Sequence, residues 1–219
     1  GRRCANDKVA GGGFLPGFAH RYHHIYGIYL KPLRHTPVRM LEIGLGCGMP
    51  HGAGAGIALF KNWFTHDNFT MYVAEYNRTC VEEFQNSKVV KSGSIPMSNV
   101  VLLTGDQGDP HDVAEWGRAM GNSIDIVIDD GSHKDAHMYN SFMNLWPLIS
   151  PGGLYFIEDL TVGLDPLGER HARNIGEVTR DNILIDGNIS MLDVIIRWTE
   201  QLVTSGSRSS GARRQVIQN

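Results

Sequence analysis

Carboxylates and a histidine gather at two points in the sequence. Asp129, Asp130 and His133 lie in the stretch IVIDDGSH, directly after a short apolar run, and Glu158 and Asp159 end a second apolar run, GLYFIED. Side chains alternate between the two faces of a strand, so adjacent acids point apart where a strand ends. If the two runs form neighbouring parallel strands, all four acids meet at one edge of the sheet.

Four carboxylates in a small space repel one another and do not all stay ionised without a cation. Oxygen ligands with no cysteine beside them suit Mg²⁺ or Mn²⁺ rather than zinc. An aspartate in an isolated DDG turn is more often a turn former or a helix cap. The second acidic pair, placed at the end of another apolar run, favours the cation site over that interpretation.

The elements that must position these acids alternate along the chain. Short apolar runs predict strands, and segments with helical spacing predict the helices between them. The expected strands cover 38–44, 69–76, 99–106, 123–130 and 150–159, and the expected helices cover 20–31, 57–64, 80–87, 112–120, 134–146 and 189–203. This order predicts an α/β fold with a Rossmann-like, doubly wound, mostly parallel sheet and helices on both faces.

One domain is expected over 18–203, with a flexible lead-in over 1–17 and a flexible Ser/Gly/Arg-rich tail over 204–219. In the family that this chain resembles (below), the fold closes with an antiparallel hairpin, but no convincing hairpin follows Asp159, so the terminal hairpin is predicted to be missing or altered. The polar stretch 160–182 is a candidate substrate loop. A homo-oligomer is one way to cover the sheet edge that this leaves.

A glycine-rich loop follows the first expected strand. It reads EIGLGCGM, with Glu42 before the spacing Gly44, Gly46, Gly48, and Met49 stands where a dinucleotide fingerprint needs glycine. In an open parallel sheet, ligands bind beyond the carboxyl ends of the strands, where this loop lies.

Two further acids end the next two strands. Glu75 is placed to accept hydrogen bonds from ribose hydroxyls, and Asp106 is placed to meet an adenine amino group. Three acids without a phosphate-binding Lys or Arg suit a nucleoside that carries positive charge rather than a pyrophosphate. S-adenosylmethionine is such a ligand.

Three stretches carry a family resemblance: EIGLGCGM, GDQGDP and VIDDGSHKDAHMYNSFMNLWPLISPGGLYFIEDL. They resemble the class I S-adenosylmethionine-dependent methyltransferases, and among these the metal-dependent O-methyltransferases that methylate sugar hydroxyls on macrolides and related natural products. The resemblance covers about 20–160 and implies three metal ligands, Asp130, Glu158 and Asp159, with His133 as the general base. Gln107 and Asp129 complete the predicted cofactor contacts.

The resulting expectation is transfer of a methyl group to a hydroxyl of a small metabolite, and a glycosylated metabolite is the candidate substrate. The metal lowers the pKa of the hydroxyl, and a histidine, which titrates near neutral pH, takes the proton. The first alternative is a non-catalytic cofactor- or metal-binding module completed by a partner chain. A nicotinamide-dependent oxidoreductase is disfavoured by Met49, and a hydroxylase-like relative would need a redox partner.

Composition and charge narrow the classes of protein to which this chain can belong. The chain has 219 residues and a net charge of −3, which gives no argument for nucleic acid or an anionic membrane as a partner. It has no apolar run long enough to span a membrane. The sequence has three cysteines, Cys4, Cys47 and Cys80, and none of them belongs to a CxxC motif. They are not expected to form a disulfide framework or a zinc site, so a reduced, cytoplasmic protein is expected.

Several other residues invite a functional interpretation. The resemblance implies that His20 and Tyr22 contact the cofactor, whereas His23 and His24 are expected on the exposed face of a helix. His137 is expected to be a surface histidine, with a second base or a substrate contact as the alternative. Cys47 is expected to be a small side chain that fills space beside the cofactor, and Ser132 is expected to cap a helix. The core is expected to include Met138, Phe142 and Trp146, and no site role is expected for Trp63, Trp116 and Trp198.

Overall fold

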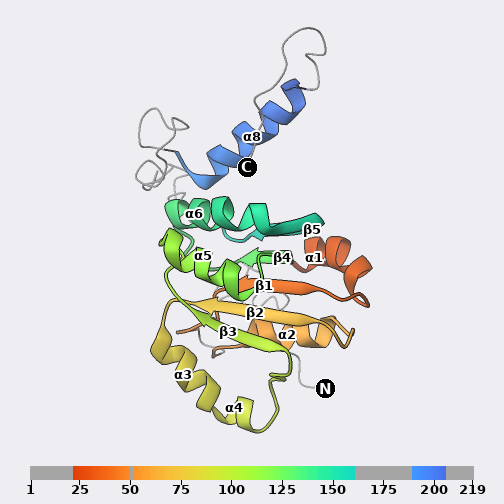
Figure 1. Cartoon of the computed structure of the whole chain (residues 1–219), viewed down its shortest axis with the longest axis vertical. Coiled ribbons are helices and arrows are strands. Elements are labelled where there is room, and N and C mark those ends of the chain that lie inside the picture. Colours follow the sequence, from red (N-terminus) through yellow and green to blue (C-terminus); the bar gives the residue numbers. More distant parts are fainter. Residues whose placement is uncertain (1–21, 50–51, 161–188, 206–219) are drawn as a thin grey trace, which may run out of the picture.

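The computed structural model describes residues 22–49, 52–160 and 189–205. Its centre is a sheet of five parallel strands in the order β3-β2-β1-β4-β5 (Figure 1). The strands are β1 (Arg39–Ile43), β2 (Thr70–Glu75), β3 (Val100–Thr104), β4 (Ile124–Asp129) and β5 (Ile149–Ile157). The chain winds outward from β1 to β3 and then returns to place β4 on the other side of β1. The boundary between β1 and β4 is therefore the switch point at which such sheets bind ligands.

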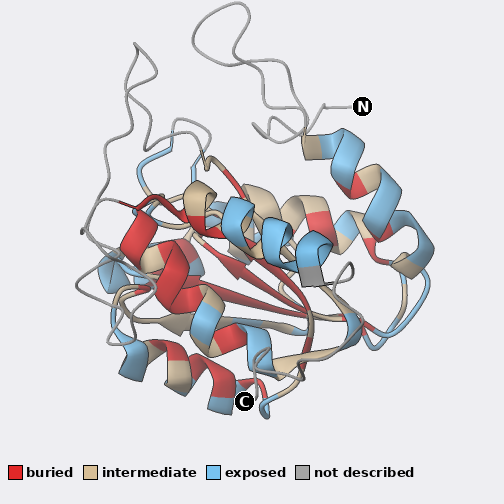
Figure 2. Ribbon diagram, turned by 90° about the horizontal axis from the view of Figure 1, so that it is seen from above, coloured by how far each residue is buried: buried red, intermediate tan, exposed pale blue. Residues whose placement is uncertain are grey.

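Helices cover both faces of the sheet. They are α1 (Tyr22–Leu30), α2 (Ala55–Trp63), α3 (Arg78–Asn86), α4 (Lys88–Lys91), α5 (Pro110–Ala119), α6 (Asp135–Leu145) and α8 (Met191–Ser205), with short 3₁₀ turns at Lys31–Leu33 and Trp146–Leu148. α1, α2 and α3 share one buried cluster with the sheet, and α5 and the end of α6 share the other. Figure 2 shows the buried strands between these layers. The predicted α/β fold is confirmed.

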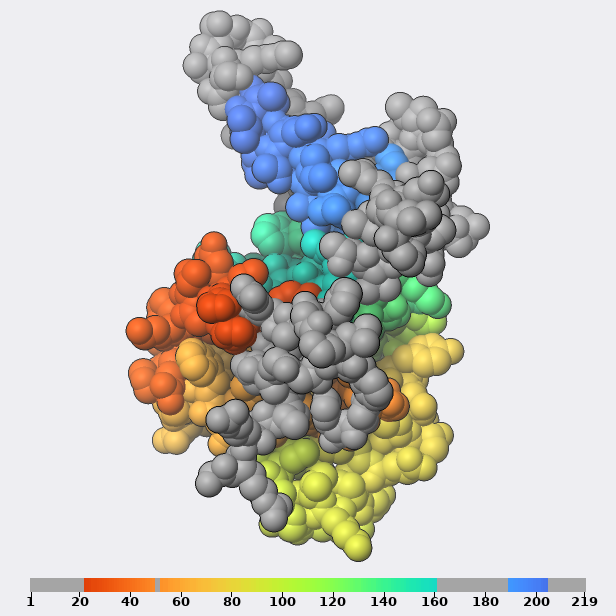
Figure 3. All heavy atoms as spheres, turned by 180° about the vertical axis from the view of Figure 1, so that it is seen from behind, coloured from red at the N-terminus to blue at the C-terminus, as the bar shows by residue number. Residues whose placement is uncertain are grey.

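Local chemistry explains several of these boundaries. Asn77 caps α3 by accepting a hydrogen bond from the Cys80 N–H, and Asp109 caps α5, where Pro110 occupies the first turn. α8 packs its apolar side on α6 through Met138, Met191 and neighbouring side chains, and it stands out from one end of the molecule (Figure 3). No helix within the described ranges is both long and apolar enough to cross a membrane.

Some expectations differ from the structure. The short helix α4 was not expected, and Trp146, expected in the core, is 47 % exposed. α6 ends at Leu145, so the 3₁₀ turn that follows takes Trp146 off the buried helix face and stacks it on Phe142. Within the described residues no strand follows β5, which is an edge of the sheet. The predicted lead-in, His20, nearly all of the candidate substrate loop and most of the tail lie outside those residues.

Candidate active site

A cavity of about 590 Å³ opens at the carboxyl edge of the sheet, where β1 meets β2 and β4. This volume lies in the range that small ligands and cofactors occupy. Most of the predicted site residues line it: Glu42, Gly44, Gly46, Glu75, Asp106, Gln107, Asp130, His133 and Asp159. Four of the predicted residues are described by the structure but are not among its lining: Tyr22, Gly48, Asp129 and Glu158.

The glycine loop approaches its neighbours closely. Gly44 has a φ of +105°, and a Cβ there would collide with the backbone carbonyl of Asp130. A Cβ on Gly56, in the first turn of α2, would collide with the buried Glu42 carboxylate. These two glycines therefore bring the loop against the tip of β4 and bring the start of α2 against the Glu42 carboxylate.

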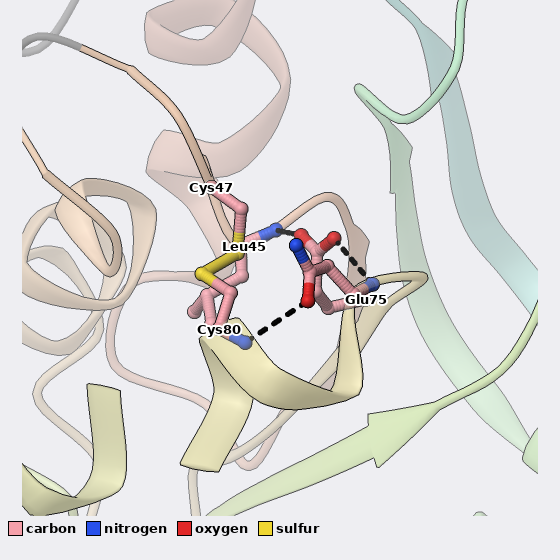
Figure 4. Close-up of a disulfide and its surroundings, with 5 residues drawn as sticks. Leu45, Cys47, Glu75 and Cys80 are labelled. Atoms are coloured by element: carbon pink, nitrogen blue, oxygen red, sulfur yellow. Dashed lines mark hydrogen bonds between the residues drawn. A yellow bond between two sulfur atoms is a disulfide. The ribbon is translucent and has the colours of Figure 1, made fainter. Parts of the chain in front are cut away.

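The Glu75 side chain stabilises the glycine loop through a hydrogen bond. Its Oε2 accepts a hydrogen bond from the Leu45 N–H at 3.0 Å, and its Oε1 accepts one from the Asn77 N–H at 2.9 Å (Figure 4). The carboxylate thus links the loop after β1 to the start of α3 while it lines the cavity. This structural role comes in addition to the predicted contact with ribose.

A disulfide between Cys47 and Cys80 ties the glycine loop to the first turn of α3 (Figure 4). The two Cα atoms lie 6.2 Å apart, which is within the usual range for a disulfide. The expectation of reduced cysteines is therefore wrong for this pair. The residues are 33 positions apart in the sequence, and only the folding of the loop onto α3 brings them together.

Asp106 follows β3 and lines the cavity. Its Oδ1 accepts a hydrogen bond from the Gly108 N–H and lies 3.8 Å from Nδ1 of His137. His137 is not a plain surface residue, since it also lines the cavity and contacts the Ser132 hydroxyl. Burial lowers the pKa of His137, with the charge of Asp106 acting in the opposite direction. The neutral imidazole is therefore favoured there.

Asp129 belongs to a buried network behind the cavity. Its carboxylate accepts hydrogen bonds from the Gln107 amide, the Ser141 hydroxyl and the Tyr155 hydroxyl. Burial raises the pKa of Asp129 to about 6, and these donors partly offset the effect. Gln107 in turn accepts a hydrogen bond from the Ser132 N–H. Both side chains, predicted to bind cofactor, here support the loop that carries His133.

Asp130, His133 and Asp159 form a compact group that faces the cavity. One ligand atom from each lies within 4.8 Å of the others, and the His133 Nε2 is 3.9 Å from Asp130 Oδ1 and 3.8 Å from Asp159 Oδ2. His133 and Asp159 both have a φ of +54°, which is uncommon for residues other than glycine. Such backbone conformations persist where the surroundings hold them, and they cluster at functional sites.

These side chains fit a divalent cation. The two carboxylates supply the oxygen donors that Mg²⁺ or Mn²⁺ prefers, and no cysteine belongs to this group among the described residues. The imidazole of His133 lies beside these carboxylates. The His133 Nδ1 is buried and has no hydrogen-bond partner within the described part of the chain. Nε2 is therefore the ring nitrogen that can meet a ligand.

Two tyrosines of α1 reach the acids at the end of β5. The Tyr26 hydroxyl donates to Glu158 Oε1, and the Tyr22 hydroxyl donates to Asp159 Oδ1 at 2.7 Å. Burial, together with these carboxylates, raises the pKa of both phenols, so they remain protonated donors. Tyr22 thus contacts a predicted metal ligand and is not among the residues that line the cavity. The helical spacing of this segment predicts a helix but gives no sign that Tyr26 bonds Glu158.

Comparisons with known proteins find relatives of this chain among methyltransferases. No protein-family model matches the chain. It is 31 % identical over 145 residues to the mycinamicin VI 2''-O-methyltransferase of Micromonospora griseorubida, a match that covers 66 % of this chain and 32 % of the relative. It is 34 % identical over 145 residues to the demethylmacrocin O-methyltransferase of Streptomyces fradiae, covering 66 % and 33 %. The chain therefore matches about a third of the length of these relatives.

A solved structure shares the fold. It is the MycE methyltransferase from the mycinamycin biosynthetic pathway in complex with Mg, SAH and mycinamycin VI. The TM-score is 0.61 with 26 % sequence identity, and the match covers 88 % of this chain and 45 % of that chain. These similarities confirm the resemblance that the sequence motifs carried.

Proposed function

We propose that this chain, which is related to the S-adenosylmethionine-dependent O-methyltransferases of macrolide and polyketide sugars, transfers a methyl group from S-adenosylmethionine to a sugar hydroxyl on a small molecule. Mg²⁺, or Mn²⁺ in its place, is the proposed metal cofactor. One observation carries the proposal: a single cavity joins the acids predicted to bind the nucleoside, Glu75 and Asp106, to the group Asp130, His133 and Asp159.

The carboxylates of Asp130 and Asp159 would hold the cation, and Glu158, adjacent to Asp159, is proposed as the third ligand. When bound, Mg²⁺ supplies positive charge that makes a nearby hydroxyl easier to deprotonate. The relative whose structure contains Mg and SAH supports the same pair of cofactors for this chain.

His133 is the proposed general base. Its Nε2 takes the proton of the acceptor hydroxyl, and the oxygen bonds to the methyl carbon as the carbon–sulfur bond breaks and sulfur keeps the electron pair. A base must lie within hydrogen-bond reach of the proton that it removes, and Nε2 is the ring nitrogen presented to the site. The cavity would hold the sulfonium and the hydroxyl in line, which is a large part of such catalysis.

The proposal is tested by following transfer of a labelled methyl group from S-adenosylmethionine to a glycosylated macrolide. Transfer should require Mg²⁺, stop with EDTA and return when excess Mg²⁺ is added. Transfer that survives complete chelation would contradict the cation's role. Binding of S-adenosylmethionine with no transfer to any hydroxylated acceptor would instead favour a non-catalytic binding module.

A further inference from the structure

α1 places two phenols opposite two consecutive acids. Tyr22 and Tyr26 are four residues apart, so both point from one face of the helix. Opposite them, Glu158 and Asp159 follow directly after β5, and each tyrosine bonds one of the acids. α1 lies beside β5 in the fold (Figure 1), although the bonded residues are 132 and 137 positions apart in the sequence.

The contact between Tyr26 and Glu158 is enclosed. Tyr26 is 7 % exposed and Glu158 is 3 % exposed. The phenol ring packs edge-on against Phe60 of α2 and Phe156 of β5, with ring centroids 5.9 and 5.2 Å apart. This packing fixes the ring, so its hydroxyl fixes the direction of one carboxylate oxygen of Glu158.

Tyr22 holds Asp159 at two points. Its hydroxyl donates to Oδ1 at 2.7 Å and accepts a hydrogen bond from the Asp159 N–H at 2.8 Å. One group therefore fixes both the side chain and the backbone of a residue whose φ is +54°. The other carboxylate oxygen, Oδ2, lies 3.8 Å from the His133 Nε2, within the proposed cation site.

We propose that Tyr22 and Tyr26 are positioning residues that orient Asp159 and Glu158 for a divalent cation and so set the cation affinity of the site. The inference rests on the proposed function, because it takes these acids as cation ligands. Groups that hydrogen-bond to ligating carboxylates orient them, and loss of such a partner typically weakens metal binding about 10–100-fold. Through these bonds, α1 becomes part of the metal site without contacting the metal.

The test is a titration of the full chain with Mn²⁺, in which the free ion is followed by electron paramagnetic resonance. The variants are Tyr22→Phe and Tyr26→Phe, which remove only a hydroxyl. Tyr29→Phe is the matched control, since Tyr29 is on the same helix and is 53 % exposed. The dissociation constant for Mn²⁺ should rise about 10-fold or more in the first two variants and stay at the wild-type value in the control. Affinity for S-adenosylmethionine without metal, and the melting temperature in EDTA, should stay close to wild type in Tyr22→Phe.

Each other outcome has a separate meaning. If wild type binds Mn²⁺ and both variants bind it equally well, the positioning role is overturned while the cation site stands. If wild type itself binds no Mn²⁺, the metal part of the proposed function fails and the positioning role falls with it. If Tyr22→Phe loses metal and S-adenosylmethionine affinity to the same extent, the hydroxyl acts only on general structure and the proposal is overturned. Should Tyr26→Phe fail to fold, Tyr22→Phe alone decides the matter.

Discussion

The His133 Nε2 lies 3.8 Å from the Asp159 Oδ2, which joins the loop after β4 to the end of β5. Both residues have a left-handed backbone conformation, and Tyr22 fixes Asp159 from outside the cavity. The β1–β4 switch point thus holds a histidine between two carboxylates next to a cavity of cofactor size.

His133→Asn should lower the turnover rate about 10²–10⁴-fold, because the proposed general base is lost. Asparagine tolerates the left-handed backbone at this position better than most residues, so the fold should be kept. The rate is measured by transfer of a labelled methyl group, and the affinity for S-adenosylmethionine should not change. His111→Asn, a change of an exposed histidine on α5, is the control. Full activity in His133→Asn would rule out its role as base.

Glu75→Gln should weaken binding of both S-adenosylmethionine and adenosine about 10-fold. The amide can no longer accept on both sides, so it loses either the predicted ribose contact or a bond to the Leu45 or Asn77 N–H. Calorimetry with each ligand gives the two affinities. Glu82→Gln, on the exposed side of α3, should bind like wild type. Equal affinities in Glu75→Gln and wild type would remove Glu75 from the cofactor site.

Reduction of the Cys47–Cys80 disulfide should lower the free energy of unfolding by about 2–4 kcal/mol, the usual contribution of a disulfide. It should also weaken S-adenosylmethionine binding, because the glycine loop is released from α3. Denaturant unfolding with and without reductant measures the first effect. Cys80→Ser should reproduce both changes, and Cys4→Ser should reproduce neither. Rapid alkylation of Cys47 and Cys80 in the native, unreduced protein would show that the bond is absent.

Asp129 should make stability depend on pH in a direction opposite to that of an ordinary acid. Its raised pKa, about 6, means that the folded state binds more protons than the unfolded chain above about pH 4. Stability from this group is therefore full below about pH 4 and is lost as the pH rises through about 6. Relative to wild type, Asp129→Asn should thus gain about 3 kcal/mol between pH 4 and pH 7.

That difference is measured by denaturant unfolding in EDTA, so that no cation contributes. Asp109→Asn is a suitable control, because the residue is an exposed helix cap and asparagine also caps helices. A difference between Asp129→Asn and wild type that stays constant across this pH range would show that Asp129 ionises normally.

Much of the fold and part of the site could be predicted from local patterns. Each strand is an apolar run that ends in glycine or an acid, so the sequence places Glu75, Asp106 and Asp130 at strand ends without reference to distant residues. Parallel pairing then brings these ends to one edge of the sheet, where the cavity lies.

The rest depends on contacts between distant segments. The Cys47–Cys80 bond requires the loop after β1 to fold onto α3, and the spacing of the cysteines in the sequence does not predict this bond. Alternation along β4 predicts that Asp129 and Asp130 point apart, but it cannot show that Gln107, Ser141 and Tyr155 enclose one of them. Tyrosines at helical spacing are as consistent with simple packing as with hydrogen bonding to an acid. The bonds of Tyr22 and Tyr26 to the acids after β5 therefore appear only in the structure.

The most direct test of the account is a calorimetric titration of S-adenosylmethionine and then Mg²⁺ into wild type and Asp130→Asn. The account predicts that both proteins bind S-adenosylmethionine and that only wild type binds Mg²⁺ tightly, because Asp130 supplies one of the grouped carboxylates. Absence of S-adenosylmethionine binding by wild type would contradict the assignment of the cavity. Equal Mg²⁺ binding by the two proteins would contradict the placement of the cation.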